Sequence, residues 1–172
     1  RALISELLDF RKLEQGHVKL KVYEQNIVPF LKEIYLSFYE YASSRSITYL
    51  FTSEKENINC WFDPKQMQKV FYNLLSNAFK FTPKEGNITV SVLRKKEFAE
   101  IRISDTGSGI PQSQQAHIFE RFYRTDASRN SMKGGSGIGL SIVKKIIEDH
   151  GGYIWATSKE GEGTCLHFVI RK

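Results

Sequence analysis

Three polar side chains recur at helical spacing near the middle of the chain. Asn73, Asn77 and Lys80 fall within roughly 60° of one another on a helix that turns by about 100° per residue. Carboxamide oxygens are hard ligands that suit Mg²⁺, and a lysine ammonium can neutralise phosphate oxygens. The stripe indicates a site for a metal-bound phosphate, and a solvated helix edge with two ordinary asparagines is the alternative.

The segment DTGSGIP at 105–111 follows a predicted strand and places a carboxylate ahead of two glycines. Asp105 can accept a hydrogen bond from an exocyclic amine such as that of adenine. Gly107 and Gly109 carry no side chain that would block a flat ring. These features favour a base-binding turn, and a tight turn without a ligand is the alternative.

The glycine-rich segment GGSGIGL at 134–140 leads into a predicted helix. Backbone N–H groups of such loops bind phosphate at helix N-termini. The spacing of Gly135, Gly137 and Gly139 differs from the GxGxxG dinucleotide fingerprint, and the chain contains no GxxxxGK[ST] loop. A phosphate-binding loop of another kind is therefore indicated, with a flexible linker as the alternative.

The segment IFERFYR at 118–124 precedes a polar stretch without apolar periodicity, so we expect a mobile loop over 124–137. Ile118, Phe119 and Phe122 are apolar enough to anchor one end of this loop. Four cations are then placed to reach phosphates, unless they form a plain surface charge run: Arg121, Arg124, Arg129 and Lys133.

The patterns predict an α/β sandwich with one mixed sheet to position these segments. Helical periodicity and capping residues predict helices at 3–13, at 27–41 after Asn26, from Asp63-Pro64 to about Thr82, briefly after Pro111, and from Gly139 to Gly151. Alternation and short apolar runs predict strands at 18–23, 47–51, 58–62, 87–95, 99–107, 153–158 and 164–171.

Length and composition limit the classes of function. The 172 residues suit one compact domain with a short arm, and 41% apolar with 26% charged residues excludes a disordered chain. The net charge of +6 suits a nucleotide as well as nucleic acid, but no aromatic and basic platform favours nucleic acid. We expect no membrane span and no signal peptide, and we interpret Cys60 and Cys165 as free thiols in a reducing compartment.

Taken together and in order, four motifs resemble the N, G1, F and G2 boxes of the catalytic ATP-binding domain of bacterial sensor histidine kinases. The motifs are NLLSNAFKFTP, DTGSGIP, IFERFYR and GGSGIGLSIVKKIIEDHGG. The superfamily also contains type II topoisomerases, mismatch-repair ATPases and a class of heat-shock chaperones. The resemblance implies a Bergerat-like two-layer sandwich, with a mostly antiparallel sheet packed on helices. Because SELLDFRKLEQGHVKL resembles the end of the family's dimerisation bundle, we expect a bundle remnant at 1–16 and the catalytic domain at 17–172.

The resemblance also implies a role for each matching residue. Asn77, helped by Asn73, would hold Mg²⁺. The catalytic set would be Asn77, Lys80 and Arg124. The nucleotide-binding set would be Asn73, Asn77, Lys80, Phe81, Asp105, Gly107, Gly109, Ile110, Phe122, Lys133, Gly135, Ser136, Gly137, Gly139 and Leu140.

The implied activity is that of an ATP-dependent protein-histidine kinase with ATP and Mg²⁺ as cofactors. Its acceptor would be a histidine on the parent's own dimerisation domain, and a response-regulator receiver domain would act downstream. We expect a homodimeric parent that is a candidate inner-membrane sensor. For this domain we expect a cytoplasmic location and no contact with nucleic acid or membrane.

Two other functions are compatible with a domain of this superfamily: a conformational ATPase clamp and a degenerate nucleotide-binding regulator. Asn73 argues against the first of them. ATP-hydrolysing members of the superfamily usually carry a glutamate at this position to activate water. A carboxamide is no general base, so Asn73 favours transfer over hydrolysis. The intact set of asparagines, aspartate and glycines favours an active domain over a degenerate one.

None of the four histidines lies in a phosphoacceptor motif, so we expect the acceptor to lie outside this chain. His17, His117 and His167 are interpreted as surface or strand residues. His150 precedes two glycines at a predicted helix end, where we expect a cation that complements the helix dipole.

Overall fold

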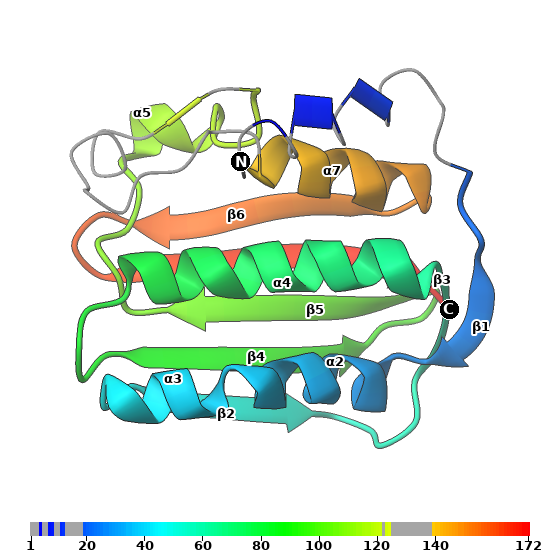
Figure 1. The fold of residues 1–172 in the computed structure, drawn as a ribbon, viewed down its shortest axis with the longest axis horizontal. Coiled ribbons are helices and arrows are strands. Elements are labelled where there is room, and N and C mark those ends of the chain that lie inside the picture. Colours follow the sequence, from blue (N-terminus) through cyan, green and yellow to red (C-terminus); the bar gives the residue numbers. More distant parts are fainter. Residues whose placement is uncertain (1–3, 5–6, 9–10, 13–18, 122, 125–138) are drawn as a thin grey trace.

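The computed structural model describes residues 4, 7–8, 11–12, 19–121, 123–124 and 139–172. These residues form two layers, with helices packed on one face of a five-stranded sheet (Figure 1). In spatial order, the strands of the sheet are β2 (Thr48–Ser53), β4 (Asn87–Arg94), β5 (Phe98–Asp105), β7 (Gly163–Arg171) and β6 (Tyr153–Lys159). Strand β2 pairs parallel with β4, and the other three pairs are antiparallel. The predicted sandwich with a mixed, mostly antiparallel sheet is confirmed.

The helical layer consists of α2 (Ile27–Ser37), α3 (Tyr39–Ser44), α4 (Pro64–Phe81) and α7 (Gly139–Asp149), and the short α5 (Gln112–Gln115) lies near one end of β6. Helix α4 lies between the α2–α3 pair and α7 (Figure 1). Residues 4, 7, 8, 11 and 12 are helical, as expected for this segment, and Leu7 packs against the core. No helix in the described part of the chain has both the length and the apolar character needed to cross a membrane.

The N-terminal strand differs from its prediction. We expected a strand at 18–23, but the observed strand is β1 (Tyr23–Asn26), paired antiparallel with β3 (Asn59–Phe62). Tyr23 pairs with Phe62, and the next residue, Asp63, already caps α4. The partner strand therefore ends there, and residues 19–22 have no ladder to join.

The helix predicted over 27–41 is divided into two. It begins as expected, because the Asn26 side chain accepts a hydrogen bond of 3.1 Å from the Val28 N–H. It breaks at Phe38, whose dihedral angles (φ −98°, ψ −1°) leave the ideal helical values. The ring of Phe38 stacks on Phe79 of α4 at 5.4 Å, so the break coincides with a contact between the two helices.

Helix α4 follows its prediction closely. Asp63 Oδ1 accepts hydrogen bonds from the N–H groups of Lys65 and Gln66, at 3.0 and 3.2 Å, and Pro64 occupies the first turn. The predicted apolar face is buried throughout: Met67, Val70, Phe71, Leu74, Leu75 and Ala78. It packs in the same core as the inward residues of β4 and β5, which include Ile88, Val90, Ile101 and Ile103. This shared core holds α4 against the sheet, and it thereby fixes the direction of the polar flank that carries Asn73, Asn77 and Lys80.

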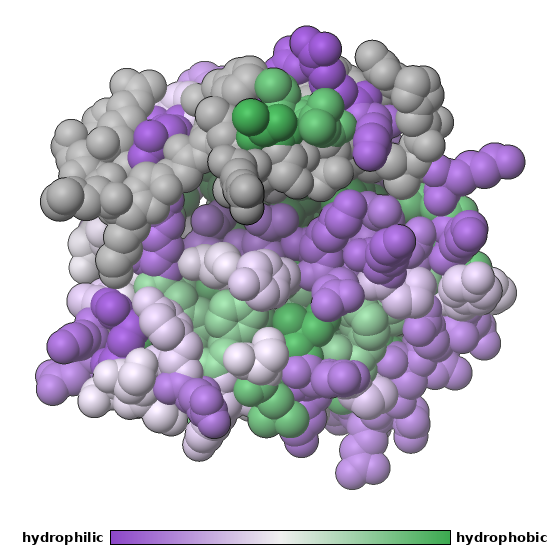
Figure 2. All heavy atoms as spheres, viewed as in Figure 1, coloured by the Kyte–Doolittle hydropathy of each residue, from purple (hydrophilic) through white to green (hydrophobic). Residues whose placement is uncertain are grey.

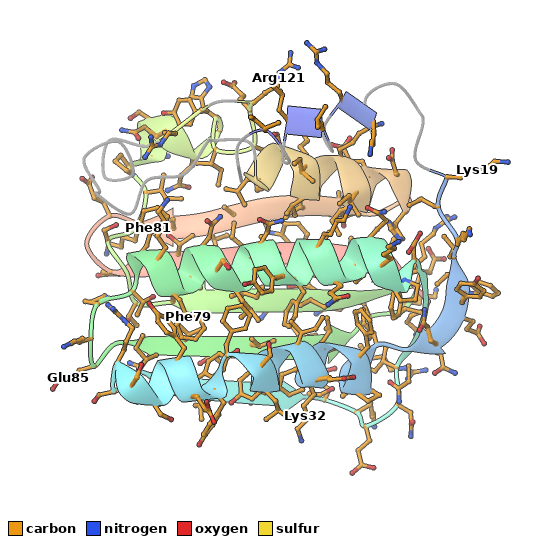
Figure 3. All side chains as sticks on the ribbon, viewed as in Figure 1. Lys19, Lys32, Phe79, Phe81, Glu85 and Arg121 are labelled. Atoms are coloured by element: carbon orange, nitrogen blue, oxygen red, sulfur yellow. The ribbon has the colours of Figure 1, made fainter. Side chains whose placement is uncertain are left out.

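The outer surface of the helical layer is mostly hydrophilic, with hydrophobic side chains visible between α2–α3 and α4 (Figure 2). Figure 3 shows Phe79 and Phe81 leaving the last turn of α4 on opposite sides. Phe79 is 3% exposed and belongs to the core, whereas Phe81 lines a pocket. The end of α4 therefore contributes to both the core and a surface cavity.

Candidate functional site

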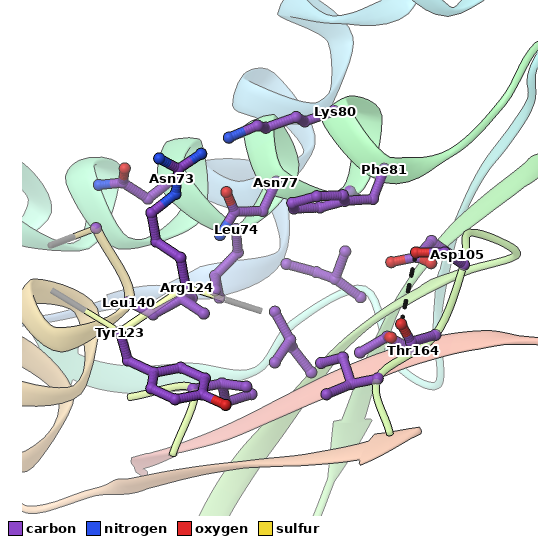
Figure 4. Close-up of a pocket in the computed structure, with 18 residues that line it drawn as sticks. Asn73, Leu74, Asn77, Lys80, Phe81, Asp105, Tyr123, Arg124, Leu140 and Thr164 are labelled. Atoms are coloured by element: carbon purple, nitrogen blue, oxygen red, sulfur yellow. Dashed lines mark hydrogen bonds between the residues drawn. The ribbon is translucent and has the colours of Figure 1, made fainter. Parts of the chain in front are cut away.

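A pocket lies between the second half of α4, the end of β5 and the start of α7 (Figure 4). Ten of the residues expected at the site line it: Asn73, Asn77, Lys80, Phe81, Asp105, Gly109, Ile110, Arg124, Gly139 and Leu140. They come from four separate segments of the sequence, and the fold brings them to one cavity.

The polar flank of α4 forms one wall of the pocket. Asn73 Nδ2 donates a hydrogen bond of 2.9 Å to the Lys69 carbonyl, one turn earlier, which leaves its Oδ1 for other partners. A Cβ atom on Gly139 would lie 3.4 Å from this Oδ1, so the first residue of α7 sits directly against Asn73. Figure 4 shows Asn73, Asn77 and the tip of Arg124 at one end of the pocket. Two amides and two cations, counting Lys80, therefore face the same space.

Asp105 stands at the opposite end of the pocket, where β5 ends. Its Oδ1 accepts a hydrogen bond of 2.9 Å from the Gly107 N–H, and a second hydrogen bond joins Asp105 and Thr164 of β7 (Figure 4). Burial raises the pKa of the Asp105 carboxyl above its ordinary value, and backbone hydrogen bonds from Gly107 and Thr164 offset part of the increase. The pocket thus holds an acid at one end and positive charge at the other.

The two glycines after Asp105 are required by packing of the protein itself. A Cβ on Gly107 would lie 2.6 Å from the Phe81 carbonyl oxygen, and a Cβ on Gly109 would lie 2.2 Å from the Lys159 carbonyl oxygen. Gly109 also has φ of +71°, which side chains disfavour. We expected these glycines to make room for a flat ring; in the protein itself, a side chain at either position would also meet nearby backbone, and at Gly107 it would meet the Asp105 carboxylate.

Sequence patterns did not single out Thr164, which also lines the pocket. It pairs with Asp105 across the β5–β7 ladder, and its Oγ1 lies 2.8 Å from the Ser158 Oγ. The hairpin around Gly161 and Gly163 was predicted, but the pairing of β7 with β5 joins residues 59 positions apart (164 − 105). A register between distant strands leaves no local signal that would have identified Thr164.

The donor set fits Mg²⁺ only when phosphate is present. Among the described residues no three histidine, cysteine, aspartate or glutamate side chains cluster as metal ligands. The amide oxygens of Asn77 and Asn73 are hard but uncharged, and Mg²⁺ usually takes few protein ligands together with substrate phosphates. The pocket is therefore suited to a metal that arrives with a nucleotide, and Lys80 and Arg124 would add neutralising charge.

Five expected nucleotide-binding residues lie outside the described residues: Phe122, Lys133, Gly135, Ser136 and Gly137. The anchor before them is confirmed in part, because Ile118 is buried and Phe119 packs against the core.

The expectation for His150 was wrong. Its side chain is 8% exposed, and its Nε2 lies 3.0 Å from the Asp63 backbone nitrogen. A backbone N–H only donates, so Nε2 must accept, and the ring is neutral rather than a cation at the helix end. His117 is a surface residue, and His167 lies in β7 between Glu100 and Thr157, both as expected. Cys60 and Cys165 are free thiols, and burial raises the pKa of Cys60 to about 12.

Residues 62–172 match the family described as histidine kinase-, DNA gyrase B-, and HSP90-like ATPase. The chain is 47% identical over 171 residues to Histidine kinase P4 of Formosa agariphila, covering 98% of this chain and 12% of that protein. It is similar to the solved catalytic domain of histidine kinase ThkA, with a TM-score of 0.79, 30% identity, and coverage of 88% of this chain and 98% of that one. It is also similar to ThkA in its complex with the response regulator protein TrrA, with a TM-score of 0.78, 26% identity, and coverage of 98% of this chain and 48% of that one. The chain spans less than half the length of the curated kinases that it matches.

Proposed function

This chain belongs to the histidine kinase-, DNA gyrase B-, and HSP90-like ATPase family, among the histidine kinase catalytic domains, and we propose that its pocket binds Mg·ATP and presents the γ-phosphoryl group to a histidine elsewhere in the parent. The observation that carries this proposal is the polarity of the pocket. A carboxylate stands at one end, and two asparagines with two cations stand at the other. Adenine and triphosphate present the complementary groups in that order.

Each described residue then has a definite task. Asp105 accepts from the adenine amine, and Phe81 offers an apolar ring beside the base. Asn77, with Asn73, supplies oxygens to Mg²⁺, which would neutralise charge on the phosphates. Lys80 and Arg124 add positive charge where the leaving diphosphate accumulates negative charge. These assignments are supported by the common lining of one pocket.

The reaction would be a phosphoryl transfer governed by positioning and electrostatics. A ring nitrogen of the acceptor histidine forms a bond to the γ-phosphorus as the bond to the β–γ bridging oxygen breaks, and ADP leaves. Asn73 cannot take a proton from water as a carboxylate would, so hydrolysis by this route has no base at that position. The domain therefore favours a protein acceptor over water.

We extend the proposal to the parent protein. Residues 1–16 would end a dimerisation bundle that carries the acceptor histidine, and residues 17–172 would form the catalytic domain. The parent would act as a homodimer and pass its phosphate to a response regulator. The complex of ThkA with TrrA supports such a partner.

Nucleotide selectivity tests the proposed site. We expect calorimetry to show tighter binding of a non-hydrolysable ATP analogue than of the matching GTP analogue, by about 10-fold or more. The reason is that guanine presents an acceptor where adenine presents an amine, and the Asp105 carboxylate also accepts. Equal affinity for the two analogues would contradict the role of Asp105, and no binding of either would contradict the proposed function.

A further inference from the structure

The ends of α4 and α7 that lie away from the pocket are joined by a hydrogen bond from the Asp63 backbone to the His150 side chain, and both residues are buried. Asp63 is 6% exposed and His150 is 8% exposed. His150 Nε2 accepts from the Asp63 N–H at 3.0 Å, while Nδ1 lies 2.7 Å from the Ile146 carbonyl and therefore donates to it. Both ring nitrogens are satisfied, so the histidine links the last turn of α7 to the residue that caps α4.

The Asp63 carboxylate extends this link to a third segment. Its Oδ1 accepts from the N–H groups of Lys65 and Gln66 at the start of α4, and its Oδ2 accepts from the Lys21 N–H at 2.9 Å. Lys21 belongs to the stretch 19–22, which directly precedes β1 in the sequence. Hydrogen bonds at the Asp63–His150 junction therefore connect three segments: residues 19–22, the start of α4 and the end of α7.

The junction and the pocket lie at opposite ends of the same helix pair. Asp63 and Asn73 are ten positions apart in the sequence, and Gly139 and His150 are eleven positions apart. At a rise of about 1.5 Å per residue these are lengths of about 15 and 16.5 Å. With Asp63 beside His150 at one end, and Asn73 beside Gly139 at the other, the two stretches are antiparallel and nearly equal in length. An axial shift of α7 at the junction would therefore move Gly139 and Leu140 by a similar distance along the pocket wall.

We propose that Asp63 and His150 are positioning residues for the nucleotide pocket, which fix the register of α7 against α4 and transmit the position of residues 19–22 to it. The proposal rests on the proposed function and deepens it. Apolar contacts between the helices are non-directional and permit small slides, whereas the hydrogen bonds at the junction are directional. Neither residue lines the pocket, so their effect on a ligand has to pass through the helices.

Two substitutions at His150 separate the two hydrogen bonds that its ring makes, because each substitution keeps only one of them. In His150→Gln, the carboxamide oxygen takes the place of Nε2 and can still accept from the Asp63 N–H. In His150→Asn, the carboxamide nitrogen takes the place of Nδ1 and keeps the bond to Ile146, but the link to Asp63 is lost. We expect His150→Asn to weaken binding of a non-hydrolysable ATP analogue by about fivefold or more, and His150→Gln to restore affinity to within about twofold of the unchanged chain.

A second matched pair of substitutions, at Lys21, tests the hydrogen bond from its backbone N–H to Asp63. Lys21→Pro removes the N–H that binds Asp63 Oδ2, whereas Lys21→Ala removes only the side chain and keeps that N–H. We expect the proline variant to weaken analogue binding by about twofold to fivefold, and the alanine variant to leave it unchanged.

The measurement is calorimetric titration of the 172-residue chain and the four variants with the ATP analogue and Mg²⁺, together with the melting temperature of each. Failure of the unchanged chain to bind would contradict the proposed function itself. If the unchanged chain binds and the Asn and Gln variants at 150 bind alike, the positioning role is overturned. Equal affinity of the two variants at 21 would overturn transmission from residues 19–22. A loss of affinity that follows melting temperature across all four variants would show a purely structural role and would also overturn the proposal.

Discussion

Asp105 meets two opposing demands at the end of β5. Recognition of an amine requires an ionised carboxylate, but burial raises the pKa of Asp105 and so penalises that form in the folded chain. A group whose pKa is raised by folding contributes stability only while it is protonated, and that contribution is lost as the pH rises through the raised pKa. At neutral pH the ionised form of Asp105, which is proposed to bind the adenine amine, therefore lowers the stability of the nucleotide-free domain.

The first prediction concerns Asp105→Asn. We expect this variant to melt at a higher temperature than the unchanged chain at pH 7 without nucleotide, because the penalised charge is gone and Oδ1 can still accept from Gly107. The difference should shrink as the pH falls toward the raised pKa, since the unchanged chain then takes up a proton. Affinity for an ATP analogue should fall by about 10-fold or more. Scanning calorimetry and titration at several pH values check both parts, with the surface variant Glu56→Gln as the control; a lower melting temperature at pH 7 would contradict the account.

The second prediction concerns Asn77→Ala. Because its amide oxygen is proposed to bind Mg²⁺ through a nucleotide, removal should weaken Mg·ATP binding by about 10-fold while changing metal-free binding by less than about twofold. Titration with and without Mg²⁺ measures the two affinities. Asn59→Ala, on an exposed position of β3, is the matched control and should change neither. Equal losses in both conditions would remove Asn77 as a metal ligand.

Many individual residues of the candidate site were predictable from the sequence. The spacing of Asn73, Asn77 and Lys80 on one helix, and the position of Asp105 after a strand, are local properties of the chain. Thr164 was not predictable in this way, because its place beside Asp105 depends on the register of two distant strands. The neutral state of His150 was missed for the same reason, since its partner Asp63 lies 87 residues away in the sequence.

Among the elements, α4 carries two functions on opposite sides, and its last turn allows them to be separated. Phe79 packs with the rings of Phe38, Tyr41 and Tyr49, whereas Phe81 lines the pocket. We expect Phe79→Ala to cost about 3–5 kcal/mol in the free energy of unfolding, as large core truncations do. Phe81→Ala should cost clearly less and instead reduce ATP affinity. Urea unfolding and nucleotide titration of both variants check this division, and the reverse pattern would show that the faces of α4 have been misassigned.

The turn after β5 offers a second matched pair of substitutions. Gly109 and Gly161 have similar dihedral angles, with φ of +71° and +82°, so alanine is strained at both. A Cβ at Gly161 meets nothing within 4 Å, so Gly161→Ala should cost about 1–2 kcal/mol from the left-handed conformation alone. Gly109→Ala adds a clash with the Lys159 carbonyl and should cost more, and it should also lower ATP affinity by displacing the turn beside Asp105. Similar unfolding energies for the two variants would contradict the packing argument.

The elements that were predicted well are those with strong local signals. Asp63 and Pro64 predict the start of α4, and its buried apolar residues recur at helical spacing from Met67 to Phe79. The breaks and pairings were harder to foresee. The division of the helix after Asn26 coincides with the contact of Phe38 with Phe79 of α4, and β1 begins only at Tyr23 because β3 ends at Phe62. In both cases a distant partner decides where a local pattern stops.

For the molecule as a whole, the fold brings the groups proposed to bind a nucleotide into one pocket. The pocket gathers an acid, two amides and two cations, and none of the four histidines in the chain lies in a phosphoacceptor motif. The N-terminal residues that are described are helical, and Leu7 packs against the core, so the arm meets the domain directly. An acceptor supplied by the parent would approach a site that is already built.

The most direct test of this account is phosphoryl transfer with the missing acceptor restored. The chain is incubated with Mg²⁺ and ATP labelled at the γ-phosphate, first alone and then with the adjoining helical segment of its parent. We expect nucleotide binding but no stable acid-labile label on the chain alone, and slow labelling of a histidine in the added segment, because separate pieces lose the effective concentration of a linker. The transfer should be lost in Asn77→Ala. Strong acid-labile labelling of the isolated chain, or nucleotide binding without any transfer to the restored segment, would contradict the central claim.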